Sequence, residues 1–165
     1  MPLLDDGAPP PWQVQRWFNT DANAPPTLDG LRGRVVVLHS FQMLCPGCVS
    51  HAIPQMAQLQ RAFARTDLAL IGLHTVFEHH AVMGADALQV FMHEYRITYP
   101  VGIDQPGEDG DPLPLTMRAY GLRGTPSLLL FDRRGRLRMH EFGQVHDLAL
   151  GYQLGCLLTE PADAA

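Results

Sequence analysis

Three short apolar runs constrain the fold of this chain more than any other feature. They occupy residues 35–38 (VVVL), 68–73 (LALIGL) and 127–131 (SLLLF). A strand with one buried face alternates apolar and polar residues, whereas a continuous apolar run is typical of a strand buried on both faces. We therefore expect a central sheet that other elements cover on both sides.

The segments between these runs predict helices and one hairpin. The expected helices cover residues 49–65, 85–95, 115–120 and 147–158, with Pro54 as an interruption and Asp147 as a candidate N-cap. The expected further strands cover residues 99–103 and 136–142, the second after a turn at residues 132–135. This order predicts an α/β fold in which a central mixed β-sheet carries helices on both faces and an antiparallel hairpin at one side.

The first 27 residues differ in composition from the rest of the chain. They are rich in Pro, Asp and Asn, and their large apolar side chains are Trp12, Trp17 and Phe18. We expect residues 1–27 to form an extension that packs on the domain or trails from it, with one short helix or strand near residues 12–19. Residues 28–160 would form one domain, which suits a chain of 165 residues.

Charge and hydropathy exclude several partners. The chain has 12 basic and 17 acidic residues, a net charge of −5, and all the basic residues are Arg. Because phosphate binding needs a dense basic face, we expect no nucleic-acid partner. We expect no membrane partner either, since no apolar stretch approaches the length of a membrane helix. The acidic, Pro-rich start lacks a signal peptide, which favours a cytoplasmic protein, or a periplasmic one if a leader has been removed.

Two of the three cysteines lie together directly after the first apolar run, as Cys45-Pro46-Gly47-Cys48. One close pair without a second pair indicates redox chemistry rather than a complete zinc site. At the end of a strand and the start of a helix, unpaired N–H groups stabilise a thiolate. Cys45 is therefore the candidate attacking thiol and Cys48 the candidate resolving thiol. Cys156, among leucines, is expected to be buried in the last helix.

These features resemble the thioredoxin superfamily, most closely its TlpA-like and redoxin (AhpC/TSA-related) branch. The matching segments are residues 28–37 (LDGLRGRVVV), the cysteine pair, residues 118–125 (RAYGLRGT), Pro126 and residues 127–137 (SLLLFDRRGRL). The resemblance implies a thioredoxin-like fold and thiol–disulfide oxidoreductase activity. It implies no cofactor, because the dithiol itself carries the electrons.

The resemblance also implies how a substrate would be held. Pro126 would be cis and would face the cysteine pair, and the Thr125 backbone would pair with the substrate chain beside the disulfide. Pro46 and Gly47, between the two cysteines, complete the candidate substrate-binding residues.

The sequence departs from the thioredoxin pattern at three places. Leu44 stands where Trp usually precedes the first cysteine, and Pro54 lies six residues after Cys48 rather than five. One extra residue in the helix, such as a π-bulge, would reconcile the second departure. His39 replaces the buried acid of thioredoxin, so it is either the base that takes the Cys48 proton or a core histidine bonded to the backbone. His51 would help to stabilise a thiolate or would be solvated.

Histidines also gather after the second apolar run. His74, Glu78, His79 and His80 fall in the segment LHTVFEHH, and strand ends of an open α/β sheet tend to face the functional crevice. A metal or substrate role and an ordinary solvated loop are both compatible with this segment. We assign no metal ligand here.

The leading functional hypothesis is a thiol–disulfide oxidoreductase that exchanges electrons with protein or small-molecule thiols and disulfides. One alternative is a peroxiredoxin-like thiol peroxidase, although that family has a Thr three residues before its reactive cysteine and a Pro three residues earlier. Gln42 and His39 occupy those places here. Another alternative is a copper or zinc carrier that uses the two thiolates and a histidine. A non-catalytic thioredoxin-like module is the last, and the sequence leaves the oligomeric state open.

Overall fold

The computed structural model describes residues 8–108 and 110–161. Its strands are β1 (Val14–Phe18), β2 (Val35–Phe41), β3 (Leu68–His74), β4 (Val101–Asp104), β5 (Ser127–Phe131) and β6 (Leu137–Phe142). Its α-helices are α1 (Ile53–Ala62), α2 (Ala85–Glu94), α3 (Leu115–Ala119) and α4 (Asp147–Thr159). The strands form one sheet in the order β1-β4-β3-β2-β5-β6.

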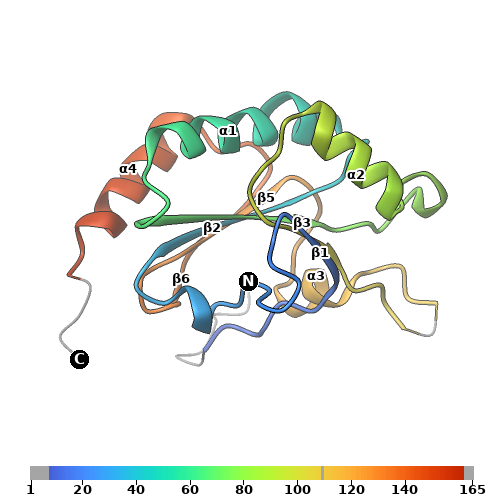
Figure 1. Ribbon diagram of the computed structural model, residues 1–165, viewed down its shortest axis with the longest axis horizontal. Coiled ribbons are helices and arrows are strands. Elements are labelled where there is room, and N and C mark those ends of the chain that lie inside the picture. The colour runs from blue at the N-terminus through green and yellow to red at the C-terminus, as the bar shows by residue number, and fades with distance from the viewer. Residues whose placement is uncertain (1–7, 109, 162–165) are drawn as a thin grey trace.

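The sheet is mixed and is covered on both faces, so the predicted α/β fold is confirmed. Helices α1, α2 and α4 lie on one face and α3 on the other (Figure 1). Strands β2 and β3 pair in parallel and are buried along their whole length. Alternate β2 side chains enter two different cores, with Val35 and Val37 on the side of α1 and Val36 and Leu38 on the side of α3. The apolar run of β2 is therefore continuous because the strand is buried on both faces of the sheet, as the sequence predicted.

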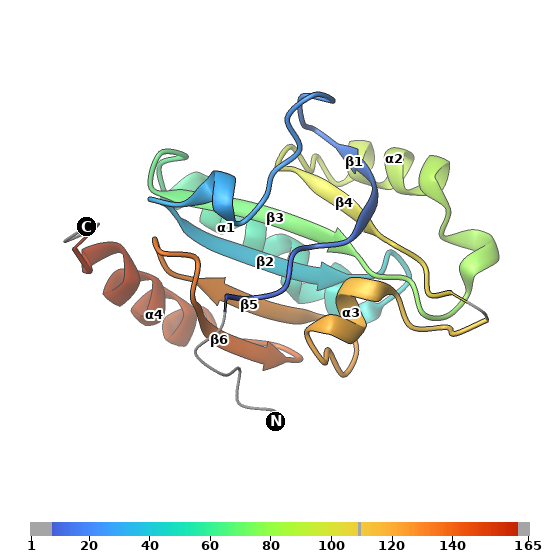
Figure 2. The ribbon, with the colours of Figure 1, turned by 90° about the horizontal axis from the view of Figure 1, so that it is seen from below.

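Both edges of the sheet are antiparallel pairs (Figure 2). The predicted hairpin is β5 and β6, and it lies at one edge. The short element expected near residues 12–19 is β1, a strand that pairs with β4 at the other edge. The division of the chain at residue 27 stays a prediction.

The helix after the cysteines contains the extra residue that the sequence called for. Cys48–Ala52 is a π-helical segment, in which the N–H of Ile53 donates to the Cys48 carbonyl. Pro54 follows in the first turn of α1. A π-helical turn holds one residue more than an α-helical turn. The predicted π-bulge is confirmed.

The structure corrects one expectation about helix α4. Its N-cap residue is His146, and no side chain caps the helix, so Asp147 is not the cap. The Asp147 carboxylate instead accepts a hydrogen bond at 2.7 Å from Nε2 of Gln55, which lies in α1. In the part of the chain that the structure describes, no helix is long and apolar enough to cross a membrane.

Candidate active site

Both cysteines of the pair lie just beyond the carboxyl end of β2. Cys45 is half-buried and Cys48 is buried, and neither forms a disulfide here. The N–H of Cys48 donates to Cys45 Sγ at 3.3 Å. The Cys45 thiol donates to the Thr125 carbonyl at 3.4 Å. Cys45 Sγ is thus held between the first turn of the helix and the loop before β5.

That loop carries the cis peptide bond. The bond joins Thr125 and Pro126, as the resemblance implied. A Cβ atom at Gly47 would lie 3.3 Å from Pro126 Cδ, so the proline ring packs closely against the glycine. The structure therefore brings Cys45, Cys48, Gly47, Thr125 and Pro126 together. Pro46 is exposed beside them, and its carbonyl accepts a hydrogen bond from Ser50.

The two thiols differ in their surroundings. Burial and a hydrogen bond with the Cys45 side chain raise the pKa of Cys48, and hydrogen bonds with the Gln42 backbone and the Thr125 side chain lower it. The balance raises the pKa of Cys48 to about 12. The reduced Cys48 is therefore a neutral thiol at pH 7, and it must lose its proton before it can attack a disulfide.

His39 lies in the core rather than against a cysteine. Its Nε2 is 3.0 Å from the Tyr99 hydroxyl, and its ring stacks on Phe41 with centroids 4.9 Å apart. A Cβ at Gly72 would lie 3.3 Å from His39 Nε2, so a glycine opposite makes room for this pair. Burial lowers the pKa of His39 to about 3 and keeps the ring neutral. Among the described residues no hydrogen bond joins His39 to Cys48.

The sequence reasoning missed Tyr99. The bond between His39 and Tyr99 joins side chains 60 residues apart, and no local pattern announces such a pair. The alternative expectation, a histidine bonded to the backbone, is also not what the structure shows. Its second ring nitrogen, Nδ1, has no hydrogen-bond partner within the described part of the chain.

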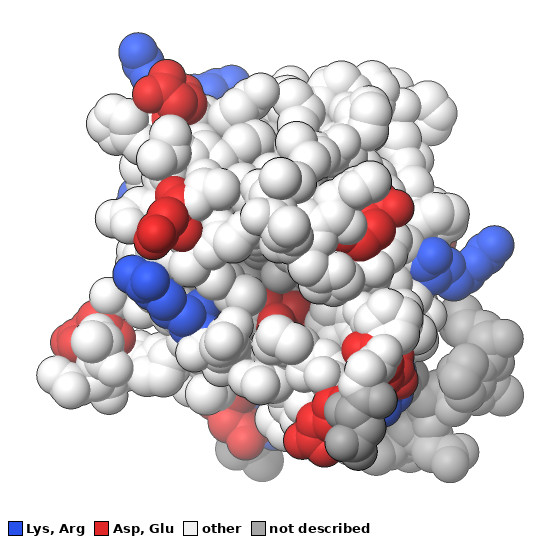
Figure 3. All heavy atoms as spheres, turned by 90° about the vertical axis from the view of Figure 1, so that its right-hand side faces the viewer, with Lys and Arg blue, Asp and Glu red and all other residues white. Residues whose placement is uncertain are grey.

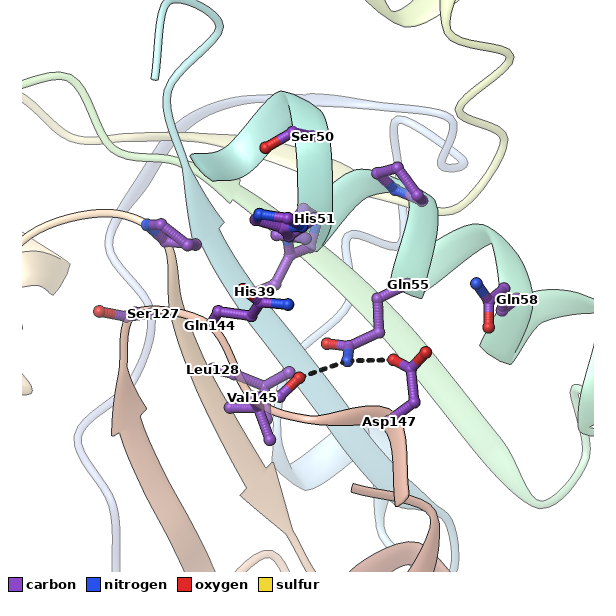
Figure 4. Close-up of a pocket in the computed structure, with 14 residues that line it drawn as sticks. His39, Ser50, His51, Gln55, Gln58, Ser127, Leu128, Gln144, Val145 and Asp147 are labelled. Atoms are coloured by element: carbon purple, nitrogen blue, oxygen red, sulfur yellow. Dashed lines mark hydrogen bonds between the residues drawn. The ribbon is translucent and has the colours of Figure 1, made fainter. Parts of the chain in front are cut away.

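A cavity of about 140 Å³ opens beside the cis-proline, and His39, His51 and Pro126 line it. Figure 4 shows polar side chains from α1 and from the segment before α4 around it. Gln55 Nε2 fixes one wall by donating to the Val145 carbonyl at 2.8 Å and to Asp147 (Figure 4). The exposed His51 has no hydrogen bond to either thiol in the described structure.

Gln42 is a second residue whose place the sequence did not reveal. It was noted as a departure from the peroxidase pattern, yet its side chain is 1% exposed and links three loops. Its Nε2 lies 3.3 Å from Glu78 Oε1 and 3.5 Å from Thr125 Oγ1. Its Oε1 accepts the N–H of Phe77 at 3.3 Å. Its place three residues before Cys45 in the sequence does not by itself predict these contacts.

The histidine-rich segment does not form one cluster. His74 is fully buried at the end of β3, whereas Glu78, His79 and His80 are exposed. Across residues 8–108 and 110–161, no group of three or more His, Cys, Asp and Glu side chains is arranged to hold a metal ion. The prediction for Cys156 is wrong, because its side chain is exposed and the buried face of α4 consists of Leu150, Leu154 and Leu157.

The surface at the end of the molecule where β2 and β3 terminate is mostly uncharged. Figure 3 shows separated acidic and basic side chains there rather than a patch of one sign. Leu44, directly before Cys45, is 58% exposed.

A dithiol at the start of a helix, opposite a cis-proline on this sheet, defines a thioredoxin-like thiol–disulfide oxidoreductase. Comparison with known proteins agrees. The sequence model of the AhpC/TSA family matches residues 9–140, and the chain belongs to this family.

Two solved structures are similar along nearly the whole chain. A thioredoxin-like superfamily protein is 52% identical, with a TM-score of 0.89, over 94% of this chain and 99% of its own. A thiol-disulfide isomerase from Corynebacterium glutamicum is 48% identical, with a TM-score of 0.88 and the same coverage. The protein DipZ of Mycobacterium tuberculosis is 31% identical over 137 residues, which are 79% of this chain. The chain spans 18% of the length of DipZ.

The comparisons contradict the prediction of a cytoplasmic location. The curated match is the much longer protein DipZ, and solved structures named DsbE, from Chlorobium tepidum, and StoA, from Bacillus subtilis, share the fold. The prediction rested on the first residues of the sequence. Those residues do not report the compartment of a chain that spans 18% of the DipZ length, and the prediction is withdrawn.

Proposed function

We propose that this chain exchanges electrons with protein disulfides through Cys45 and Cys48, with Cys45 as the attacking thiol and Cys48 as the resolving thiol. The observation that carries the proposal is the position of Cys45 Sγ. It is half-buried, accepts the Cys48 N–H and contacts the Thr125 carbonyl beside the cis-proline. A donated N–H at the first turn of a helix stabilises a thiolate at that sulfur.

The exchange proceeds in two steps. The Cys45 thiolate attacks a substrate disulfide, forms a mixed disulfide and releases one substrate thiolate. Cys48 then loses its proton and attacks Cys45, so that the Cys45–Cys48 disulfide forms and the second substrate sulfur leaves as a thiolate. The substrate gains two electrons and the dithiol loses two. The same steps in reverse oxidise a substrate dithiol.

Thr125, Pro126, Pro46 and Gly47 would bind the substrate chain. Besides Cys45, no donor to the Thr125 carbonyl is found in the described residues. An extended substrate could therefore add its own backbone hydrogen bonds beside the cysteine pair. The similarity to a solved thiol-disulfide isomerase supports a protein substrate. Small-molecule disulfides would react with the same Cys45 sulfur.

His39 is the proposed acceptor of the Cys48 proton. Its unpartnered Nδ1 and its place in the wall of the cavity beside Pro126 support this role. Its low pKa weakens it as a base, since proton transfer is most efficient between groups of matched pKa. We therefore expect His39→Gln to slow the resolving step less than about tenfold at neutral pH. Tenfold is the change in thiolate fraction that a shift of one pKa unit would cause.

Equilibration in glutathione buffers of graded potential tests the proposal. After alkylation, peptide mass mapping should show a reversible two-electron disulfide between Cys45 and Cys48, with Cys156 unchanged. Cys45→Ser should abolish reduction of a protein disulfide. Cys48→Ser should accumulate a mixed disulfide, and Cys156→Ser should behave as the unsubstituted protein. Absence of the Cys45–Cys48 disulfide would refute the proposal.

The same protein separates the two alternatives. A thiol peroxidase would convert Cys45 to a sulfenic acid with hydrogen peroxide faster than Cys45 exchanges with disulfides. A zinc or copper(I) carrier would bind one metal ion through both thiolates, and the bound metal would protect both cysteines from alkylation.

A further inference from the structure

The Gln42 side chain contacts the loop before β5 and the loop after β3. Its amide meets the Thr125 hydroxyl in the first and both Phe77 and Glu78 in the second. Its own carbonyl accepts the N–H of Cys45 at 3.2 Å. One buried residue thus joins the cysteine segment to both loops that border it.

The orientation of the Gln42 amide is determined by its neighbours. The Phe77 N–H can only donate, so it requires the amide oxygen, and the Glu78 carboxylate can only accept, so it requires the amide nitrogen. With these two bonds made, the NH₂ group also faces Thr125 Oγ1. The amide therefore donates to the hydroxyl and leaves the hydroxyl proton to be donated elsewhere.

The Thr125 hydroxyl proton could be donated to the Cys48 sulfur. Against the larger effect of burial, hydrogen bonding from the Thr125 side chain and the Gln42 backbone lowers the pKa of the Cys48 thiol. The Thr125 carbonyl lies 3.4 Å from the neighbouring Cys45 Sγ, so Thr125 borders the cysteine pair. A hydrogen bond donated to a sulfur is stronger when the sulfur carries a charge. In the reduced protein Cys48 is a neutral thiol, so the bond gains strength only when Cys48 becomes the attacking thiolate.

We propose that Gln42 is a positioning residue, whose amide holds the Thr125 hydroxyl so that it donates to the Cys48 sulfur during the resolving step. This inference rests on the proposed exchange through Cys45 and Cys48. In that step the Cys48 S–H bond breaks and its proton leaves. The new sulfur–sulfur bond to Cys45 forms as the bond between Cys45 and the substrate sulfur breaks, and the departing thiolate carries away the electron pair.

Dithiobis(nitrobenzoate) separates the two steps. One equivalent added to the reduced protein releases a first thionitrobenzoate as the Cys45 mixed disulfide forms. It releases a second thionitrobenzoate as Cys48 closes the disulfide. The experiment uses the full chain with Cys156→Ser, because the exposed Cys156 thiol would also react. Both phases are followed against pH.

Three substitutions probe the link. Gln42→Met keeps the length of the side chain and removes its donor, and Thr125→Val keeps the branched shape and removes the hydroxyl. We expect each to slow the second phase about tenfold and to move its pH midpoint upward, since one unit of thiol pKa changes the thiolate fraction tenfold. In Gln42→Met the first phase should stay within twofold, whereas Thr125→Val is compared by its second phase alone because Thr125 is also a proposed substrate-binding residue. Thr125→Ser, which retains a hydroxyl, should restore most of the second phase.

Non-additivity distinguishes positioning from a general loss of structure. If Gln42 acts through Thr125, the double variant Gln42→Met with Thr125→Val should be about as slow as either single variant. Gln153→Met, at an exposed place on α4, is the matched control and should leave both phases unchanged. Gln42→Glu provides a variant of similar polarity if Gln42→Met folds poorly. Its carboxylate would accept the Thr125 proton and should also slow the second phase.

Two results would overturn the inference. An unchanged second phase in Gln42→Met, or single effects that multiply in the double variant, would show that Gln42 does not act through Thr125. A protein without substitutions at Gln42 or Thr125 that never releases the second thionitrobenzoate, and shows no Cys45–Cys48 disulfide by mass, would instead overturn the exchange and the inference together.

Discussion

Two groups of buried polar residues lie at the same end of the sheet but on opposite faces, and they are satisfied very differently. On the α3 face, Asp104 is 2% exposed and makes a full set of hydrogen bonds. Its Oδ1 accepts the N–H of Thr116 at 2.9 Å, and its Oδ2 accepts the N–H of Met117 at 3.0 Å and the Thr75 hydroxyl at 3.3 Å.

On the face of α1 and α2, His39 and His74 are equally buried and poorly satisfied. His39 has one side-chain bond, to Tyr99, and His74 has none on either ring nitrogen among the described residues. Phe41 lies between the two rings, 4.9 Å from the centroid of His39 and 5.3 Å from that of His74. Both histidines lie next to the cysteine end of β2 and β3.

The difference separates a structural group from groups that cost stability. A buried polar atom stabilises the fold when its hydrogen bonds are complete, and it destabilises the fold when they are not. Asp104 completes the first turn of α3, where Pro114 offers no side-chain cap. The two histidines leave the fold sensitive to protonation beside the candidate active site.

Lowering the pH should have the largest effect, because it increases the stability cost of the two buried histidines. Burial lowers the pKa of His39 to about 3 and of His74 to about 4, from the ordinary histidine value of 6.5. Below pH 6.5 these two histidines bind protons in the unfolded chain but stay neutral in the folded chain, so the free energy of unfolding falls as the pH falls. The expected slope is about 1.4 kcal/mol per pH unit for each histidine. Burial raises the pKa of Asp104, which acts in the opposite sense at lower pH.

Urea unfolding at a series of pH values between neutral and mildly acidic measures this slope. The exposed His79 provides the control, because His79→Gln should leave the slope unchanged. A free energy of unfolding that is flat from pH 7 to pH 5 would contradict the assignment of the two histidines as buried and neutral.

Removing the Asp104 carboxylate is the next largest expected effect. Asp104→Ala leaves the N–H groups of Thr116 and Met117 and the Thr75 hydroxyl buried without their acceptor, at a cost of about 3 kcal/mol. Asp104→Asn should cost less, since its amide keeps one acceptor oxygen. Asp86→Ala, on the exposed first turn of α2, should cost less than about 1 kcal/mol. Chemical denaturation of the three variants tests the order, and equal losses would contradict it.

The elements that the sequence predicted are those whose signals are local. Apolar runs gave the three central strands, and the spacing of Pro54 gave the π-helical segment. Contacts across long separations gave no such signal: Gln42 meets Thr125 at a separation of 83 residues, and Tyr99 meets His39 at 60. These contacts define much of the candidate site, so its supporting residues emerged from the structure alone.

Helix α4 shows a second limit of sequence reasoning. Apolar residues surround Cys156 in sequence, and the helix has no charged residue after Asp147. Without a polar stripe, the pattern does not tell which face is buried. The fold buries the face of Leu150, Leu154 and Leu157 and leaves Cys156 outside. Asp147 was likewise misassigned because its carboxylate bonds to Gln55, 92 residues away.

Tyr99→Phe sharpens the comparison by making His39 resemble His74. The substitution removes the hydroxyl that meets His39 Nε2 and leaves the ring in place. We expect a loss of about 1 kcal/mol, the usual net value of one hydrogen bond. Thermal unfolding measures the loss, and Tyr152→Phe, at an exposed site on α4, is the control. Equal stability of Tyr99→Phe and the unsubstituted protein would show that His39 gains nothing from the bond.

His74→Leu should have the smallest effect at neutral pH and is the most direct test of the contrast. It replaces a ring with two unpartnered nitrogens by an apolar side chain of similar size, so the unfolding free energy should stay within about 1 kcal/mol or rise. At acid pH the same variant should be the more stable protein, because it removes one of the two titrating groups and about 1.4 kcal/mol per pH unit of the slope. Urea unfolding at neutral and acid pH measures both effects. A loss of more than about 2 kcal/mol at neutral pH would contradict the expectation that the His74 ring adds no hydrogen-bond stability.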